Sequence, residues 1–292
     1  MRAYITNFMS EFSYPDNARE VLLSTYDKIV ANPEARAIWD NALSAYNENI
    51  NCDYEGIIAK ADKASDILDI HEFTLELLIF ICMSKHLYEL YIERNLPLEY
   101  YKKSMADLRY KLDECQLVYG MVGSFVAPWF CGFFNLTRFG MGRLQFEVVP
   151  FGAHYEKNGI TLTPEDKVIN VHIPRSGEPV SQEACLESYL LAKEFFKDQI
   201  NTSPCPFVCH SWMLDPHLEE FLPRHTNTYK FFKSYDIFNT QSDKNRLSLW
   251  RIFDTMEMNP ERLGTGTSMH AAFVNYVKGG GRLGYGSGVL FI

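Results

Sequence analysis

The spacing of apolar residues divides this sequence into two parts. From about residue 16 to residue 119 they recur three and four positions apart, as in "NAREVLLSTYDKIV" and "HEFTLELLIFICMSKHLYELYIERN". This spacing places apolar side chains along one face of a helix. Pro33 and Pro97 stand where helices would begin, a position that tolerates proline. The first part of the chain is therefore predicted to be all-helical.

After residue 122 the apolar residues form short aromatic and β-branched runs instead. "FCGFFNLTRF" and "RLQFEVVPF", separated by "GMG", indicate a hairpin, and "GITLTPEDKVINVHIP" predicts two more extended segments. A helix from Ser181, a strand "PFVCHSWML" and a helical "NTYKFFKSY" follow. The last third is predicted to form a strand "RLSLWRIFD", a helix "SMHAAFVNYVK" and a glycine-rich strand "GGGRLGYGSGVLFI".

These patterns predict an α+β protein of two domains. Residues 1–122 would form an all-helical N-terminal domain, and residues 123–292 a mixed β-sheet with crossing helices. A chain of 292 residues with 47% hydrophobic residues is long enough to bury two modest cores.

Composition and charge narrow the classes of function. The formal net charge is −9 and no run of basic residues is present, which argues against a nucleic-acid partner. Seven cysteines are scattered without a disulfide pattern, as in a reducing compartment. The N-terminus has no continuous apolar segment, and Glu76, Lys85 and His86 interrupt the most apolar helix. We therefore expect a cytoplasmic protein with neither a signal peptide nor a membrane helix.

The segment "CPFVCH" contains Cys205, Cys209 and His210 in a spacing that does not fit zinc ligands. A Cys209–His210 catalytic pair is also excluded, because neighbours on a strand point to opposite faces. No metal site is expected.

Three segments, "VHIPRSG", "CHSWMLDPHLEEFLP" and "NTYKFFKSYDIF", lie behind a helical N-terminal part. Together they resemble a bacterial family of acyltransferases with a helical N-terminal domain and a GNAT-like C-terminal domain. The resemblance extends over nearly the whole chain. It implies an N-acyltransferase that uses acyl-CoA or acetyl-CoA as co-substrate and a small-molecule amine or peptide as acceptor.

In the GNAT superfamily, the loop after the fourth strand binds the CoA pyrophosphate through backbone N–H groups at a helix N-terminus. The matching residues here are Pro174, Arg175, Ser176 and Gly177. The match is imperfect, because the Arg-to-Gly spacing is one residue short and Pro179 has no N–H. Glu178 and Glu183 also bring negative charge to this place. A loop capped by Ser181, with no ligand, explains the same residues.

The resemblance also implies two candidate bases. His210 lies on the strand that matches the superfamily's fifth, and alternation places Val208, His210 and Trp212 on one face. The ordinary pKa of histidine suits a general base. Glu147, on an earlier strand, is the second candidate. The alternatives are a hydrogen-bonded core histidine and a solvent-facing glutamate.

The superfamily's next helix carries a tyrosine that protonates the departing thiolate, but Phe232 occupies that position here. Tyr235 is then the candidate acid, with Tyr229 as a second choice. The absence of tyrosine at position 232 also leaves a different class of function as the alternative. This alternative is a catalytically inert GNAT-like module that binds a small molecule or a protein.

Overall fold

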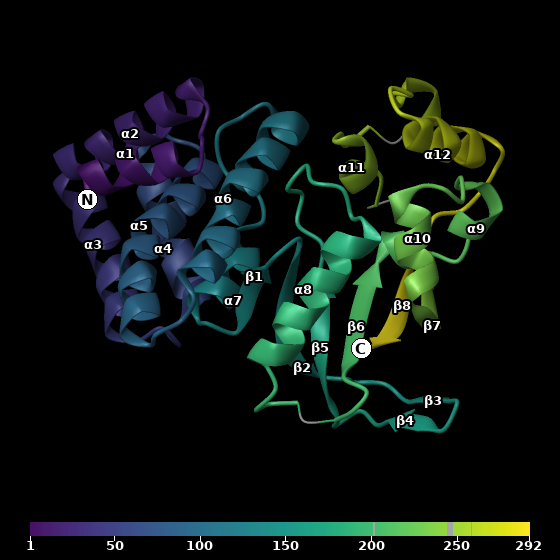
Figure 1. The fold of residues 1–292 in the computed structure, drawn as a ribbon. Helices are drawn as coiled ribbons and strands as arrows, with labels where there is room; N and C mark the ends of the chain where they lie inside the picture. The colour runs from purple at the N-terminus through teal and green to yellow at the C-terminus, as the bar shows by residue number, and fades with distance from the viewer. Residues whose placement is uncertain (201, 244–247, 258) are drawn as a thin grey trace. The chain divides into compact units, whose positions relative to one another are not determined.

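The structure, a computed structural model, describes residues 1–200, 202–243, 248–257 and 259–292. The chain divides into two compact units, Met1–Gly140 and Met141–Ile292. Figure 1 shows that the first unit is helical and that the second contains the β-sheet. The predicted α+β class, with helices first and a mixed sheet afterwards, is confirmed.

Six long helices build the helical unit. They are α1 (Arg2–Glu11), α2 (Asp16–Ala31), α3 (Pro33–Glu48), α4 (Tyr54–Leu68), α5 (Glu72–Glu93) and α6 (Leu98–Tyr119). As expected, Pro33 opens α3, where the Asn32 side chain accepts hydrogen bonds from the Glu34 and Ala35 amides. α5 is the central helix, and every residue from Thr74 to Ser84 is buried. α1 was not predicted.

The segment after α6 belongs to this helical unit. The Ser124 amide donates to the Phe73 carbonyl over 2.9 Å, and the Thr74 hydroxyl donates to the Val122 carbonyl over 2.6 Å. The sequence pattern placed the change of domain at residue 122, whereas the structure divides the chain after Gly140.

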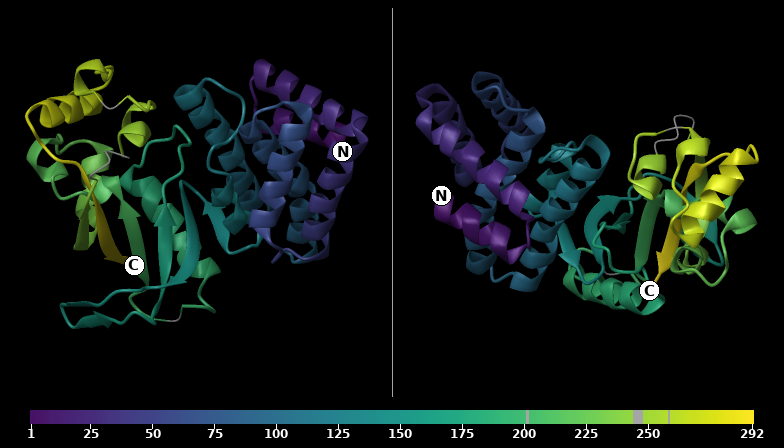
Figure 2. Two further views of the ribbon diagram at one scale, coloured as in Figure 1. Left: turned by 180° about the vertical axis from the view of Figure 1, so that it is seen from behind. Right: turned by 90° about the horizontal axis from the view of Figure 1, so that it is seen from above.

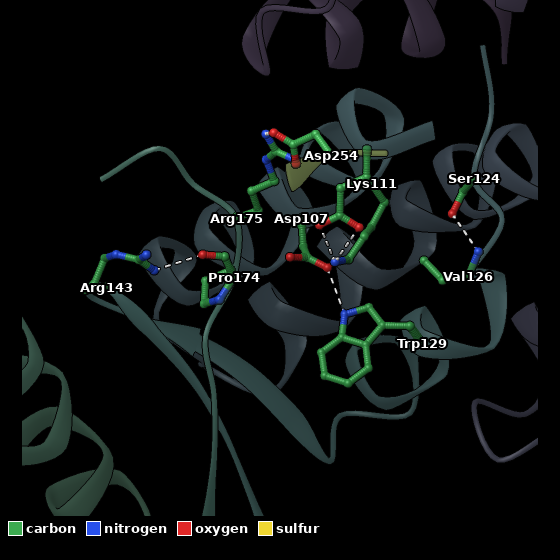
Figure 3. A network of polar contacts seen from close by, with 10 residues as sticks. Asp107, Lys111, Ser124, Val126, Trp129, Arg143, Pro174, Arg175 and Asp254 are labelled. Atoms are coloured by element: carbon green, nitrogen blue, oxygen red, sulfur yellow. Dashed lines mark hydrogen bonds and ion pairs between the residues drawn. The ribbon is translucent and has the colours of Figure 1, made fainter. Parts of the chain in front are cut away.

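The apolar run at residues 130–134 explains the difference. It forms the end of η1 (Ala127–Phe130) and the short helix α7 (Cys131–Phe134) instead of the expected strand. Phe130 and Phe134 pack edge-on against Phe80, with ring centroids 5.2 and 4.9 Å from it. Nearby, the Trp129 indole N–H donates to the buried Asp107 carboxylate over 2.8 Å (Figure 3).

The main sheet has six strands in the order β1-β2-β5-β6-β8-β7. The strands are β1 (Arg138–Met141), β2 (Leu144–Pro150), β5 (Lys167–His172), β6 (Pro206–Ser211), β7 (Asp236–Ser242) and β8 (Gly284–Phe291). β5 and β6 are parallel, while the pairs β2/β5, β6/β8 and β7/β8 are antiparallel. β3 (Tyr155–Lys157) and β4 (Ile160–Leu162) form a separate hairpin. The strands of the main sheet lie side by side in the left view of Figure 2.

Shorter helices connect these strands. They are α8 (Gln182–Phe195), η2 (Trp212–Leu214), α9 (Leu218–Phe221), α10 (Asn227–Ser234), α11 (Ser248–Phe253), η3 (Pro260–Arg262) and α12 (Ser268–Lys278). The prediction of a strand for "RLSLWRIFD" is wrong for residues 248–253, which form helix α11. Residues 244–247 lie outside the described ranges. The strand β7 was not expected.

Different elements pack against the two faces of the sheet. On one face, Tyr189 of α8 packs against Phe146 and Phe207, with ring centroids 6.1 and 5.1 Å apart. On the other face, Val168 and Val289 lie in an apolar cluster with residues of the β3–β4 hairpin. This second face therefore has an apolar end beneath the hairpin.

The predicted glycine-rich last strand is confirmed as β8, and its glycines have a packing role. A Cβ added at Gly286 would lie 1.9 Å from the Leu214 carbonyl oxygen, and one at Gly288 would lie 2.8 Å from Cβ of Tyr235. The absence of side chains at these positions allows η2 and the end of α10 to approach the strand closely.

Candidate functional site

The parallel strands β5 and β6 pair over a short distance and then separate. The registered pairs are Ile169 with Phe207 and Asn170 with Val208. Beyond them β5 continues to His172 and β6 continues to Ser211. The sheet is therefore open at the carboxyl ends of its two parallel strands, where open α/β sheets bind their ligands.

Three polar side chains meet beside this opening. Glu147 lies opposite Asn170 in the β2/β5 register. Its Oε1 atom is 2.7 Å from Nε2 of His172 and accepts a hydrogen bond from the Asn170 side-chain amide over 3.2 Å. The side chains of His172 and Glu147 are 20% and 14% exposed. At this distance the carboxylate can accept a hydrogen bond from the imidazole and hold the orientation of its ring.

His210 projects from the same face of the sheet, two positions beyond Val208, which is registered with Asn170. The residue is accessible to solvent, although its ring stacks on Tyr285 with centroids 5.5 Å apart and places Nδ1 2.9 Å from the Ser287 hydroxyl. Partial burial lowers the pKa of His210 below its ordinary value. His210 is thus not a core residue, and the neutral ring required of a base is favoured at pH 7.

The structure corrects one detail of the β6 prediction. The strand ends at Ser211, and Trp212 begins the 3-10 helix η2, so strand alternation does not place Trp212 beside His210. Cys209 is buried on the opposite face, which agrees with the exclusion of a Cys209–His210 pair.

Tyr235 lies away from these groups. It packs against Gly288, whose register partner Cys209 belongs to the α8 side of the sheet. Its hydroxyl is 2.9 Å from that of Tyr189, and burial raises the pKa of Tyr235 well above its usual value. The structure therefore brings Glu147 and His210 to one face and does not bring Tyr235 to them.

The expected cofactor loop, residues 174–177, follows β5 directly. Gly177 has a φ of +78°, which favours glycine, and a Cβ there would meet nothing within 4 Å. Arg175 forms an ion pair with both carboxylate oxygens of Asp254, and the Arg143 guanidinium donates to the Pro174 carbonyl over 2.9 Å (Figure 3). The loop conformation is thus fixed by side chains from other elements.

The loop leads into the N-terminus of α8. Ser181 caps the helix by accepting a hydrogen bond from the Ala184 amide over 3.2 Å. The pKa of Glu183 is lowered by a bond from its own backbone N–H and then by the Ser181 side chain. A carboxylate therefore already lies at the positive end of the helix.

Sequence reasoning missed Asn170, His172, Arg143 and Tyr285. A signal existed for the first two, because "VINVH" alternates and places two polar residues on one face of an otherwise apolar strand. Nothing in the sequence pattern singled out Arg143, whose loop partners lie 31 and 35 residues away.

Other kinds of site were also considered. Within the described ranges, no group of three or more His, Cys, Asp or Glu side chains could hold a metal ion. No helix among these residues is long and apolar enough to cross a bilayer.

Comparison with known families gives two matches. Residues 138–290 match the family described as a GNAT-like C-terminal domain. Residues 3–136 match the family described as an N-acyltransferase N-terminal domain. The N-terminal match ends four residues before the end of the first compact unit, and the C-terminal match begins three residues before the start of the second unit. No curated protein matches the sequence.

Solved structures with the same fold include an acyltransferase in complex with decanoyl-CoA and teicoplanin. It is 19% identical, with 98% of this chain and 87% of that chain covered and a TM-score of 0.73. An acyltransferase mutant in complex with octanoyl-CoA is 18% identical, with the same coverage and a TM-score of 0.76. An acyltransferase in complex with decanoyl-CoA is 17% identical over 98% and 86% of the two chains, with a TM-score of 0.73. At these identities the similarity establishes the fold.

Proposed function

Because the chain belongs to the family defined by the GNAT-like C-terminal domain, we propose that it is an N-acyltransferase that transfers an acyl group from acyl-CoA to an amine. The observation that carries this proposal is the Glu147–Asn170–His172 cluster beside the opening between β5 and β6. The acyl-CoA complexes of structures with this fold support the choice of co-substrate.

In the proposed reaction, the acceptor nitrogen attacks the thioester carbonyl carbon. A C–N bond forms, the C–S bond breaks, and CoA leaves as a thiolate. His172 takes the proton that the nitrogen loses, and Glu147 stabilises the resulting imidazolium over the 2.7 Å contact. His210, neutral at pH 7 because its pKa is lowered, is a second base on the same face. The thiolate takes its proton from water, since Tyr235 lies on the other face.

The loop of residues 174–177 would hold the CoA diphosphate. Its positive-φ glycine and its place before the α8 N-terminus support this role. The acceptor is proposed to be a small-molecule amine or a peptide, and one structure of the same fold holds teicoplanin beside its decanoyl-CoA.

Titration calorimetry with acetyl-CoA, octanoyl-CoA and decanoyl-CoA tests the co-substrate. Saturable heat with at least one of them is expected. The rival is a catalytically inert module that binds a different molecule, and it would give no heat with any thioester. Release of free thiol on addition of an amine panel then tests the transfer itself.

Replacing the candidate bases tests the site. Glu147→Gln and His172→Gln are expected to lower kcat on the order of 10²-fold, the usual scale of general-base catalysis. The matched controls Glu156→Gln and His154→Gln alter exposed residues of the same unit. If the His210→Gln variant keeps full activity, His210 has no part in the mechanism. If the His172→Gln variant keeps full activity, the Glu147–His172 pair does not supply the base.

A further inference from the structure

Arg143 holds the two ends of the proposed diphosphate loop. It is only 8% exposed and lies in the turn between β1 and β2. Its Nε atom donates to the Glu178 carbonyl over 2.8 Å, and Nη1 donates to the Pro174 carbonyl over 2.9 Å. One rigid, planar guanidinium thus fixes the distance between the residues that begin and end the loop.

The position of Arg143 is also fixed by a hydrogen bond from its own backbone amide. Its amide donates to the Ser188 hydroxyl over 2.8 Å, and that hydroxyl donates to the Ala184 carbonyl over 2.7 Å. Gly142 supplies the positive φ of +61° that the turn needs. The same arginine therefore ties the loop to the first turns of α8, whose N-terminus the loop approaches.

These bonds also orient the loop for an anion. In a trans peptide the C=O and the following N–H point in opposite directions. Because the Pro174 carbonyl points at Arg143, the Arg175 N–H points away from it. The Glu178 carbonyl precedes Pro179, which has no N–H to orient. The guanidinium thus draws two partly negative oxygens to one side of the loop and leaves an amide on the other.

Arg175, the arginine of the loop itself, is held differently. Both oxygens of Asp254 bind its guanidinium. The charge of Arg175 is therefore offset by a neighbouring carboxylate, and its guanidinium is directed toward Asp254.

We propose that Arg143 is the positioning residue of the CoA-diphosphate loop: its two hydrogen bonds preset the backbone between Pro174 and Glu178 for the diphosphate. This inference rests on the proposed function. On this inference, loss of Arg143 weakens the binding of the CoA diphosphate and leaves the reaction of the thioester unchanged.

The test compares octanoyl-CoA with S-octanoyl-pantetheine, which carries the same thioester but no diphosphate. Arg143→Gln is expected to raise the Kd and KM for octanoyl-CoA about tenfold, since the preset loop geometry is lost. It should leave kcat, and the kcat/KM for S-octanoyl-pantetheine, within about twofold of wild type. Arg224→Gln, which removes an exposed arginine of the same unit, is the charge-matched control and should change neither substrate.

A second variant covers the case in which Arg143→Gln does not fold. Arg143→Lys keeps the charge but loses the planar fork, so a smaller loss confined to octanoyl-CoA is expected, with thermal unfolding measured alongside. Equal losses with both thioesters, or unchanged affinity for octanoyl-CoA, would overturn the inference. No binding of octanoyl-CoA by the wild type would overturn the proposed function, and the inference with it.

Discussion

Glu76 is a carboxyl group in a place where a charge is unfavourable. It lies in the buried stretch of α5, and burial raises its pKa to about 7, with Asp62 and Glu72 acting in the same direction. A raised pKa means that the fold favours the protonated form. The stabilising contribution is therefore complete below the ordinary value of about 4.5 and is lost as the pH rises through about 7.

We predict that wild-type stability falls by roughly 2.5 kcal/mol between pH 5 and pH 8 from this group alone. Glu76→Gln should remove that loss, because the amide cannot ionise. Glu93→Gln, on the exposed part of the same helix, should behave as wild type. Urea unfolding at several pH values measures the effect, and a Glu76→Gln variant that keeps the full pH dependence would show that another group is responsible.

Glu183 is predicted to weaken anion binding at the α8 N-terminus. Its carboxylate accepts its own backbone N–H, which lowers its pKa and occupies the positive end of the helix. Glu183→Gln should tighten the binding of CoA by roughly two- to fivefold, the usual scale of a charge near a helix end. The gain should shrink at high salt, and calorimetry at two ionic strengths checks both points. Weaker binding in the variant would contradict this role.

At the scale of elements, β8 depends on Gly286. A methyl group there would overlap the Leu214 carbonyl oxygen, a backbone atom that cannot turn aside. Gly286→Ala is predicted to destabilise the protein by about 3 kcal/mol or more. Gly264→Ala is the control, because a Cβ at Gly264 meets nothing within 4 Å. Thermal unfolding of the two variants compares them, and equal melting temperatures would contradict the packing argument.

Some elements could be read from the sequence and others could not. The helices from α2 to α6 are long enough for their apolar spacing to be seen, and α8 has a clear cap at Ser181. The strand β7 shows no apolar alternation because it lies at the edge of the sheet with its last residues exposed. α7 and α11 have four and six residues, too few to separate a helix from a strand by periodicity.

Part of the candidate site could also be predicted from the sequence, and part could not. Alternation along β6 placed His210 and Cys209 on opposite faces, but it left open whether His210 lies in the core. The contact between Glu147 and His172 depends on the β2/β5 register, and the Arg143 bonds depend on the folded loop. Such contacts join residues 25 and 35 positions apart, and no local pattern encodes them.

At the scale of the whole molecule, the proposed site belongs to the sheet and not to any one segment. Glu147 comes from β2, His172 from β5, His210 from β6, and the Tyr285 and Ser287 partners of His210 from β8. The first and last of these residues are 140 positions apart. Each of these four strands supplies one or two groups, so the site exists only when β2, β5, β6 and β8 have paired.

The strand order has a consequence for how the chain is made. β8 lies between β6 and β7, although it follows both along the chain. While the protein is being synthesised, β7 has no partner in the sheet until β8 leaves the ribosome, and β6 exposes an unpaired edge for the same period. The strand edges of the nascent chain therefore remain unpaired while α11 and α12 are synthesised. During this interval a chaperone would protect the chain from aggregation.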